Sequence, residues 1–430
     1  MKGLKKELNL FEVTLYGVGI ILGAGIYALI GQGAGLTGNS LWLSFVIGAV
    51  VASFTGLSYA ELATIFPRAA AEYLYVTKAF GSRLLAFLIG WLHLLTATAT
   101  VAVVSLGFSG YLSALLGTPI LLTAIILISI LSFINYLGIK QSSRVNVLFT
   151  LIEISGLILI ILLSLTNVRH VISINYFQMN NGTQGLLAAA ALVFFAYIGF
   201  EDIANVAEET KNAKRVLAKA FILAVAITTV LYILTAVAAV SLVSPDALNA
   251  SKSPLALAAS KSFLGNNAFV LLSIIALFAT SNTVLVAMIV SSRMMYGMSR
   301  DKALPSFLSR LDVRRGTPIF SIAIFMVFAF AFLFMGGISF IANMTSLTAF
   351  LTFALVNACL ILLRYKSPSI HRPFKTPINI GKFPVLAFLG LISSIFMAFQ
   401  FKIEVVLFTV GVAFIGVLVF TINNKFQAKH

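Results

Sequence analysis

The feature that most constrains this chain is a series of apolar segments, each long enough to cross a lipid bilayer as a helix. About 20 helical residues span the hydrocarbon core of a membrane. Charged residues make up 10% of the 430 residues, against about 25% in soluble domains. The sequence therefore predicts an all-α integral membrane protein. We place twelve transmembrane helices at 10–36, 41–66, 84–116, 119–138, 145–166, 186–207, 217–243, 267–298, 318–336, 340–363, 383–401 and 403–422.

The distribution of basic residues along these spans explains the net charge of +16. With the N-terminus inside, 25 of the 29 Lys and Arg residues fall on inner connections, and Arg169, Lys252, Lys261 and Lys402 fall on outer ones. This positive-inside asymmetry predicts a multi-pass protein of the plasma membrane with both termini cytoplasmic. The expected partners are the lipid bilayer, with some affinity for anionic lipid, and a small-molecule substrate. Neither nucleic acid nor an obligate protein partner is indicated.

The first span contains Gly17, Gly19, Gly23 and Gly25. Each glycine in a helix interior costs about 1 kcal/mol relative to alanine, so this cluster indicates a helix that can be interrupted. In a bilayer, freed backbone groups are tolerated only where they are buried in protein or line a cavity, and interrupted spans form the binding sites of many transporters. The alternative is that these small residues only allow close helix packing. A dinucleotide-binding loop is excluded because the strand and acidic residue that it requires are missing.

The sixth span has a similar irregularity at Gly199, which is followed closely by Glu201 and Asp202. A charged residue at the centre of a span costs about 2.5–3.5 kcal/mol on insertion scales and usually faces the protein interior or water. Apolar residues continue at 203–207, which favours a span that continues beyond the carboxylates. The alternative is that the span ends at Gly199.

The two interrupted spans are five positions apart, as in transporters built from two inverted repeats of five helices. We therefore predict one repeat at 1–166 (spans 1–5), a second at 186–363 (spans 6–10), and two appended spans at 383–422. The connections between spans are short, so no separate soluble domain is expected.

Five motifs give the chain a specific resemblance, at 23–27, 59–68, 194–201, 293–305 and 372–377. They occur in the order found in amino acid permeases of the amino acid–polyamine–organocation superfamily. The chain is most similar to the cationic amino acid transporter-like branch, over nearly its whole length. This resemblance implies the leucine-transporter fold and transport of amino acids by alternating access.

The resemblance also implies where the substrate binds. Its carboxylate would meet N–H groups near Ala24, Gly25 and Ile26, because a helix N-terminus carries unpaired donors and partial positive charge. Its ammonium group would meet backbone carbonyl groups at the ends of the first half-helices, and its side chain would lie against aromatic residues and the eighth span. The implied substrate-binding residues are Ile21, Gly23, Ala24, Gly25, Ile26, Phe195, Tyr197, Ile198, Phe200 and Ala287. Some relatives have serine at the Ala24 position, so this chain depends on backbone groups there.

The middle of the fifth span contains Glu153, at a position where proton-coupled relatives often have lysine. Three interpretations stand: a protonatable carrier, a carboxylate that holds a cation together with Ser281, Asn282 or Thr283, and a structural group bonded to another helix. Glu201 is similar in position to a gating or proton-sensing glutamate of some relatives. His93 lies inside the third span, where it is either a hydrogen-bonded structural residue or a group that titrates near neutral pH.

The leading hypothesis is amino acid transport by proton symport, with no cofactor and with protons favoured over sodium as the coupling ion. The rival hypothesis is amino acid exchange without ion coupling. A channel would show repeated polar rings or a filter, and an enzyme would show a catalytic cluster; neither pattern is present in the sequence. The sequence does not identify the amino acid.

Overall fold

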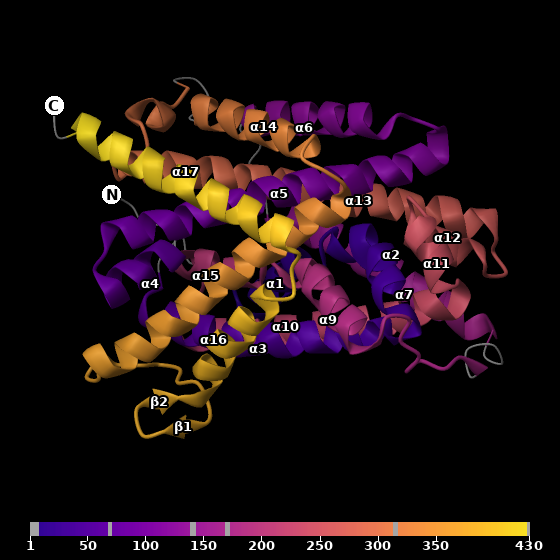
Figure 1. Ribbon diagram of the computed structural model, residues 1–430, viewed down its shortest axis with the longest axis horizontal. Coiled ribbons are helices and arrows are strands. Elements are labelled where there is room, and N and C mark those ends of the chain that lie inside the picture. Colours follow the sequence, from indigo (N-terminus) through magenta and orange to yellow (C-terminus); the bar gives the residue numbers. More distant parts are fainter. Residues whose placement is uncertain (1–7, 68–70, 138–142, 168–172, 313–316, 428–430) are drawn as a thin grey trace.

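The computed structural model describes residues 8–67, 71–137, 143–167, 173–312 and 317–427, and most of them are helical (Figure 1). Several of the basic residues used to predict the topology lie outside these ranges. They are Lys2, Lys5, Lys6, Arg68, Lys140, Arg169, Arg314, Arg315 and Lys429.

The helices of the first part of the chain are α1 (Leu10–Leu22), α2 (Gly25–Thr37), η1 (Gly38–Ser40), α3 (Leu41–Ile65), α4 (Ala71–Phe80), α5 (Arg83–Leu116), α6 (Ile120–Tyr136), α7 (Ser143–Ser164) and η2 (Leu165–Asn167), where η denotes a 3₁₀ helix. The second part contains α9 (Gly182–Val193), η3 (Phe194–Tyr197), η4 (Phe200–Glu209), α10 (Ala213–Leu242), α11 (Pro245–Ala250), α12 (Pro254–Ser260), α13 (Asn266–Arg300), η5 (Ser306–Ser309), α14 (Ile319–Leu333) and α15 (Ile338–Lys366). Two short antiparallel strands, β1 (Asn379–Ile380) and β2 (Phe383–Pro384), precede α16 (Val385–Ala398) and α17 (Ile403–Gln427).

The apolar helices identify a multi-pass membrane protein. Within the described residues, seven segments are long and apolar enough to cross a bilayer: Gly25–Ile65, Arg83–Leu116, Gly182–Ala204, Ala213–Leu242, Asn266–Arg300, Ile338–Lys366 and Ile403–Asn423. Shorter apolar helices occupy Leu10–Leu22, Ile120–Tyr136, Phe149–Ser164, Ile319–Leu333 and Val385–Ala398. Each predicted span overlaps one or more of these segments.

The first predicted span is interrupted, as the glycine cluster indicated. α1 ends at Leu22, Gly23 has a positive φ of 21°, and α2 begins at Gly25. The alternative interpretation of the glycines also holds, since they pack closely: a Cβ on Gly25 would lie 2.6 Å from the Ala196 Cα, and one on Gly19 would collide with the Thr150 side chain. The same residues therefore both interrupt the span and allow neighbouring segments to approach it.

The sixth predicted span is interrupted as well. α9 passes into the short helix η3, Ile198 is extended, and Gly199 adopts a φ of 118° that side chains rarely allow. The chain then continues as η4, in which Ile203 and Ala204 are buried. The span therefore continues past its carboxylates, and the interpretation that it ends at Gly199 was wrong.

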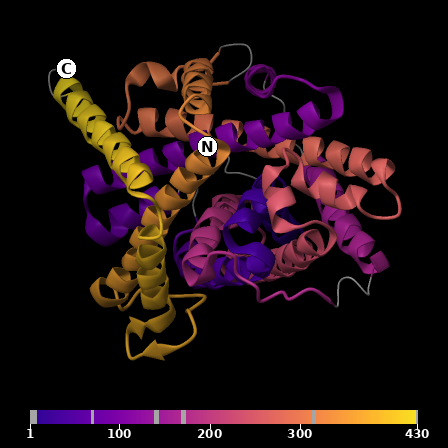
Figure 2. The ribbon, with the colours of Figure 1, turned by 45° about the vertical axis from the view of Figure 1, so that its right-hand side comes forward.

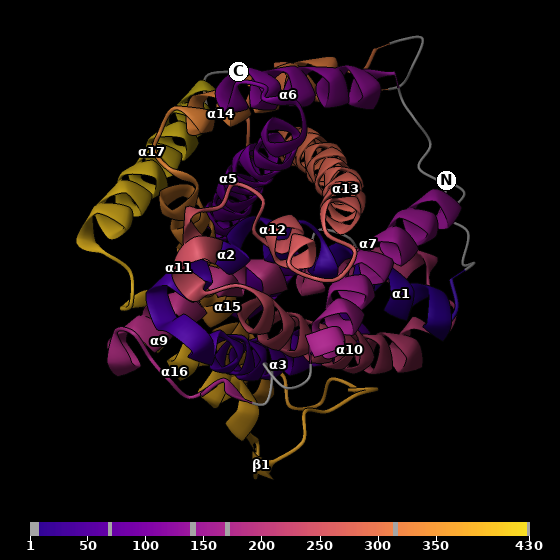
Figure 3. The same cartoon turned by 90° about the vertical axis from the view of Figure 1, so that its right-hand side faces the viewer.

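The two interruptions pack against each other. α1 and α2 both contact η3, and a Cβ on Gly199 would collide with Ile20 of α1. α10 lies against both α1 and α3, while α5 packs along α13 (Figures 1 and 3). In Figure 3, α6, α14 and α17 lie at the periphery, outside α5 and α13. The interruptions are thus enclosed by other helices.

One buried carboxylate holds together the ends of α3 and α15 and the segment before α16. Glu61 accepts hydrogen bonds from Arg364 (2.6 Å), Arg372 (3.2 Å) and the Thr376 backbone N–H (2.7 Å). Arg372 also donates to the backbone carbonyl groups of Leu363 and Ser367, among others. Arg372, the arginine of the 372–377 motif, therefore has a structural role. It anchors the segment from which the β1–β2 hairpin projects (Figure 2).

Candidate functional site

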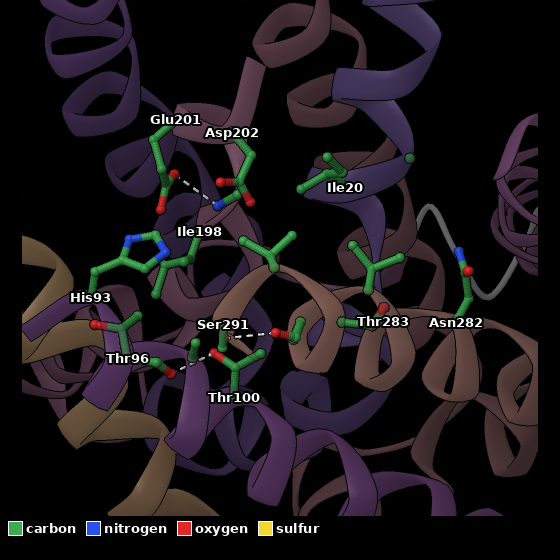
Figure 4. Close-up of a pocket in the computed structure, with 16 residues that line it drawn as sticks. Ile20, His93, Thr96, Thr100, Ile198, Glu201, Asp202, Asn282, Thr283 and Ser291 are labelled. Atoms are coloured by element: carbon green, nitrogen blue, oxygen red, sulfur yellow. Dashed lines mark hydrogen bonds between the residues drawn. The ribbon is translucent and has the colours of Figure 1, made fainter. Parts of the chain in front are cut away.

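A cavity of about 90 Å³ lies beside the two interruptions (Figure 4). This is the volume open to the centres of water molecules. Since one water needs roughly 10–15 Å³ of such volume, the cavity has room for several waters. Its walls come from α1, the interrupted sixth span, α5 and α13. The lining residues are Gly19, Ile20, His93, Thr96, Ala97, Thr100, Ile198, Gly199, Glu201, Asp202, Asn282, Thr283, Val286, Ala287, Val290 and Ser291.

The start of α2 presents backbone donors near this cavity. Ala24 is the N-cap of α2 and makes no side-chain cap, so the first N–H groups have no partner within their own helix. The Ala24 N–H donates to Thr283 Oγ1 at 3.1 Å, and Thr283 in turn donates to the Ala279 carbonyl. One of the donors predicted to bind the substrate carboxylate is therefore held by the α13 side chain that lines the cavity.

The carbonyl ends of the two first half-helices converge on one side chain that the sequence analysis did not select. The Tyr232 hydroxyl of α10 lies 2.7 Å from the Ala196 carbonyl oxygen and 3.2 Å from that of Leu22, and it also contacts the Ile21 carbonyl. A hydroxyl has a single proton, so it can satisfy only one of these acceptors at a time. The Phe195 carbonyl, in contrast, accepts from the Ile198 N–H at 3.2 Å.

The aromatic residues expected around the substrate pack into the protein in this conformation. Tyr197 is fully buried and donates to the Phe45 carbonyl at 2.9 Å. Phe200 is also fully buried and packs against Phe353, with ring centroids 5.0 Å apart. Phe195 is 5% exposed.

The structure thus divides the predicted site residues into two groups. Ile198, Ala287, Glu201 and Asn282 line one cavity together. The remaining residues lie outside its lining: Ile21, Gly23, Ala24, Gly25, Ile26, Glu153, Phe195, Tyr197, Phe200 and Ser281.

Glu153 of α7 is the most unusual buried charge near the site. Its side chain is 1% exposed, and within the described residues its carboxylate oxygens make no hydrogen bond of good geometry, although the Asn282 side chain lies close enough to donate one. Asn282, which lines the cavity, is a neighbour of this carboxylate, and the Tyr27 hydroxyl donates to the Glu153 backbone carbonyl at 2.9 Å. Buried polar groups almost always have partners, and a buried charge without one is costly. This environment is compatible with all three interpretations of Glu153: a protonatable carrier, a ligand of a cation, and a structural group bonded to α13 through Asn282.

Glu201 is held at the interruption itself. One of its carboxylate oxygens accepts the Gly199 N–H at 2.8 Å, which satisfies a backbone donor freed by the break. In Figure 4 the Glu201 side chain points toward the side of the cavity where the His93 ring lies. His93 also lines this cavity.

A helical membrane protein with a cavity at two paired helix interruptions has the features of a membrane transport protein. The profile of a family described as amino acid permease matches residues 8–422, which is nearly the whole chain. The chain belongs to this amino acid permease family.

Individual relatives agree with this assignment. The chain is 31% identical to the branched-chain amino acid permease BcaP of Bacillus subtilis, over 100% of this chain and 95% of the relative. It is 31% identical to the vacuolar cationic amino acid transporter 4 of Arabidopsis thaliana, over 85% of this chain and 64% of that protein. It is 30% identical to the human cystine/glutamate transporter, over 88% of this chain and 77% of the relative.

Proposed function

We propose that this protein is a secondary active amino acid transporter that works by alternating access and is driven by proton symport. The observation that carries this proposal is the convergence of two interrupted spans on one cavity that also contains carboxylate, hydroxyl and amide side chains. The proposal includes twelve spans in two inverted repeats with two appended helices, in a plasma membrane with both termini cytoplasmic. The relatives named above support an amino acid as the substrate.

The proposed binding mode uses the backbone at both interruptions. The substrate carboxylate lies at the N-terminus of α2, where it meets the N–H groups of Gly25 and Ile26 and competes with Thr283 for that of Ala24. The ammonium group lies among the carbonyl groups of Ile21, Phe195 and Ile198, beside the Tyr232 hydroxyl. Each end of a zwitterion then meets backbone dipoles of opposite sign.

We propose that Glu153 carries the coupled proton. Its carboxylate is buried and has only Asn282 within reach as a donor among the described residues, so its charged form is costly there and a proton is favoured. Asn282, at the cavity wall and next to Glu153, provides the connection to the substrate. The alternative is that Glu153 holds a cation together with oxygens of Ser281, Asn282 or Thr283. A second alternative is exchange without ion coupling, in which Glu153 has a structural role.

The test is uptake of a mixed pool of labelled amino acids into proteoliposomes without sodium, with and without an inward proton gradient. Proton symport predicts accumulation driven by the gradient in the wild type and its loss in Glu153→Gln. The matched control is Glu404→Gln, which removes an exposed carboxylate at the start of α17. Uptake that ignores the gradient but requires amino acid inside the vesicles would instead establish exchange. Uptake that appears only when sodium is added would favour the cation site.

A further inference from the structure

A second cavity, separate from the proposed substrate site, lies between α3 and α10. It has a volume of about 710 Å³, within the range of small-molecule pockets. The α3 wall contains Val46, Val50 and Phe54. Val50 and Val230 on its opposite walls are 46% and 56% exposed, so the cavity is a groove open at the surface of two apolar spans. In a membrane protein, this surface faces lipid.

The groove has the length of one membrane leaflet. On α10 it extends from Phe221 to Ile233, a distance of twelve residues or about 18 Å at 1.5 Å per residue. The hydrocarbon core of a bilayer is about 30 Å thick, so one leaflet is about 15 Å. The groove is therefore about as long as one leaflet is thick, which suits a single lipid chain.

Basic residues stand at one end of the same helix face. Ile222, Ala226, Val230 and Ile233 line the groove at the three- and four-residue spacing of one helix stripe. Continuing that stripe toward the start of α10 leads to Lys219 and then Arg215, and both side chains are exposed. The proposed topology places this end of α10 on the cytoplasmic side.

We infer that the groove between α3 and α10 binds an anionic phospholipid of the cytoplasmic leaflet. An acyl chain occupies the groove, and the phosphate headgroup lies at Arg215 and Lys219. The charge complementarity selects an anionic lipid over a neutral one, since basic residues near a membrane surface attract anionic headgroups. This inference depends on the proposed topology but not on the substrate or on proton coupling.

The experiment is native mass spectrometry of the purified full chain, equilibrated with an equal mixture of phosphatidylglycerol and phosphatidylcholine. We expect preferential retention of phosphatidylglycerol. Each basic residue near a membrane surface contributes about five-fold in lipid affinity, so the double variant Arg215→Gln/Lys219→Gln should weaken phosphatidylglycerol binding about thirty-fold. Ala226→Phe, which fills the groove from its exposed side, should reduce retention of both lipids.

Two controls separate this site from general effects. Lys252→Gln/Lys261→Gln removes the same charge from exposed residues on the predicted outer side, and Val410→Phe adds bulk at an exposed position of α17. Both should retain lipid as the wild type does. The inference is overturned if Arg215→Gln/Lys219→Gln binds phosphatidylglycerol normally, or if the outer double variant weakens it equally. Loss of lipid in Ala226→Phe without any effect of the Arg215 and Lys219 changes would show a neutral-lipid groove and would also overturn it.

Discussion

Tyr232→Phe tests whether the two helix interruptions are held together by a single hydroxyl. The substitution keeps the ring, which packs against Phe45 and Tyr197 with centroids 5.4 and 5.2 Å apart. It removes the hydroxyl that, among the residues the structure describes, bridges the carbonyl oxygens of Leu22 and Ala196, together with that of Ile21. The change is therefore confined to the polar contact where α1 and the sixth span meet.

The expected magnitude follows from burial. Tyr232 is fully buried, and leaving a buried acceptor unsatisfied costs about 1–3 kcal/mol. Part of this cost lowers the free energy of unfolding. The rest affects substrate binding, because the carbonyl groups proposed to receive the ammonium lose their fixed positions. Since 1.4 kcal/mol corresponds to a factor of ten, we expect KM for the amino acid to rise about tenfold.

The assay combines initial-rate uptake in proteoliposomes with thermal unfolding of the purified protein. Tyr111→Phe is the matched control, because the Tyr111 hydroxyl is equally buried and donates to one carbonyl, that of Tyr27, at 3.1 Å. Both variants should unfold at lower temperature, but only Tyr232→Phe should raise KM. Equal KM values in the two variants would refute the idea that the Tyr232 hydroxyl organises the substrate site.

Three further predictions concern other residues described above. Glu61→Gln leaves Arg364 and Arg372 without their counter-charge and should reduce stability by about 3–5 kcal/mol in chemical or thermal unfolding, whereas the exposed Glu404→Gln should not. Gly199→Ala places a side chain at a φ of 118° against Ile20 and should abolish uptake; Gly297→Ala, with open space around it, should leave uptake intact. His93→Phe makes one wall of the cavity apolar and should change the order of preference in a competition panel of unlabelled amino acids, without loss of folded protein.

The interruptions were predictable from the sequence because their signals are local. Gly23 and Gly199 lie in apolar spans where glycine is unfavourable, and Glu201 is a charge inside such a span. These features have few explanations in a bilayer, because lipid cannot form hydrogen bonds with the backbone groups that an interrupted helix exposes. Positions with strong local signals therefore indicated both the helix breaks and the neighbourhood of the cavity.

The residues that complete the site were not predictable in the same way. Tyr232 is one tyrosine in an apolar span, and its importance comes from contacts with residues more than thirty positions away, at Ala196, and over two hundred away, at Leu22. Thr283 was named only as a possible cation ligand, whereas the structure pairs it with the Ala24 N–H. Such roles depend on how distant helices pack, which helix periodicity does not specify. The predicted contacts of Phe195, Tyr197 and Phe200 with the substrate stay predictions, to be tested by transport.

The contact between Thr283 and Ala24 offers a test in which the sign of the effect identifies the ligand. Thr283→Val keeps the shape of the side chain but removes the oxygen that accepts the Ala24 N–H. If the substrate carboxylate binds at the start of α2, it no longer competes with Thr283 for this donor in the variant. The dissociation constant of the amino acid should then fall, by up to about tenfold for a hydrogen bond worth roughly 1 kcal/mol or slightly more.

Weaker binding of the amino acid to Thr283→Val would point to a different ligand of the Thr283 oxygen. If the Thr283 oxygen instead contacts the substrate or holds a cation with Glu153, the same variant should bind the amino acid more weakly. Thr280→Val is the control, because the Thr280 hydroxyl is buried and bonds within α13, to the Ala276 carbonyl at 2.6 Å, without reaching the first span. Equilibrium binding of a labelled amino acid to the three purified proteins measures the sign directly. Tighter binding in Thr283→Val alone supports a carboxylate at the α2 N-terminus, and weaker binding in that variant alone contradicts it.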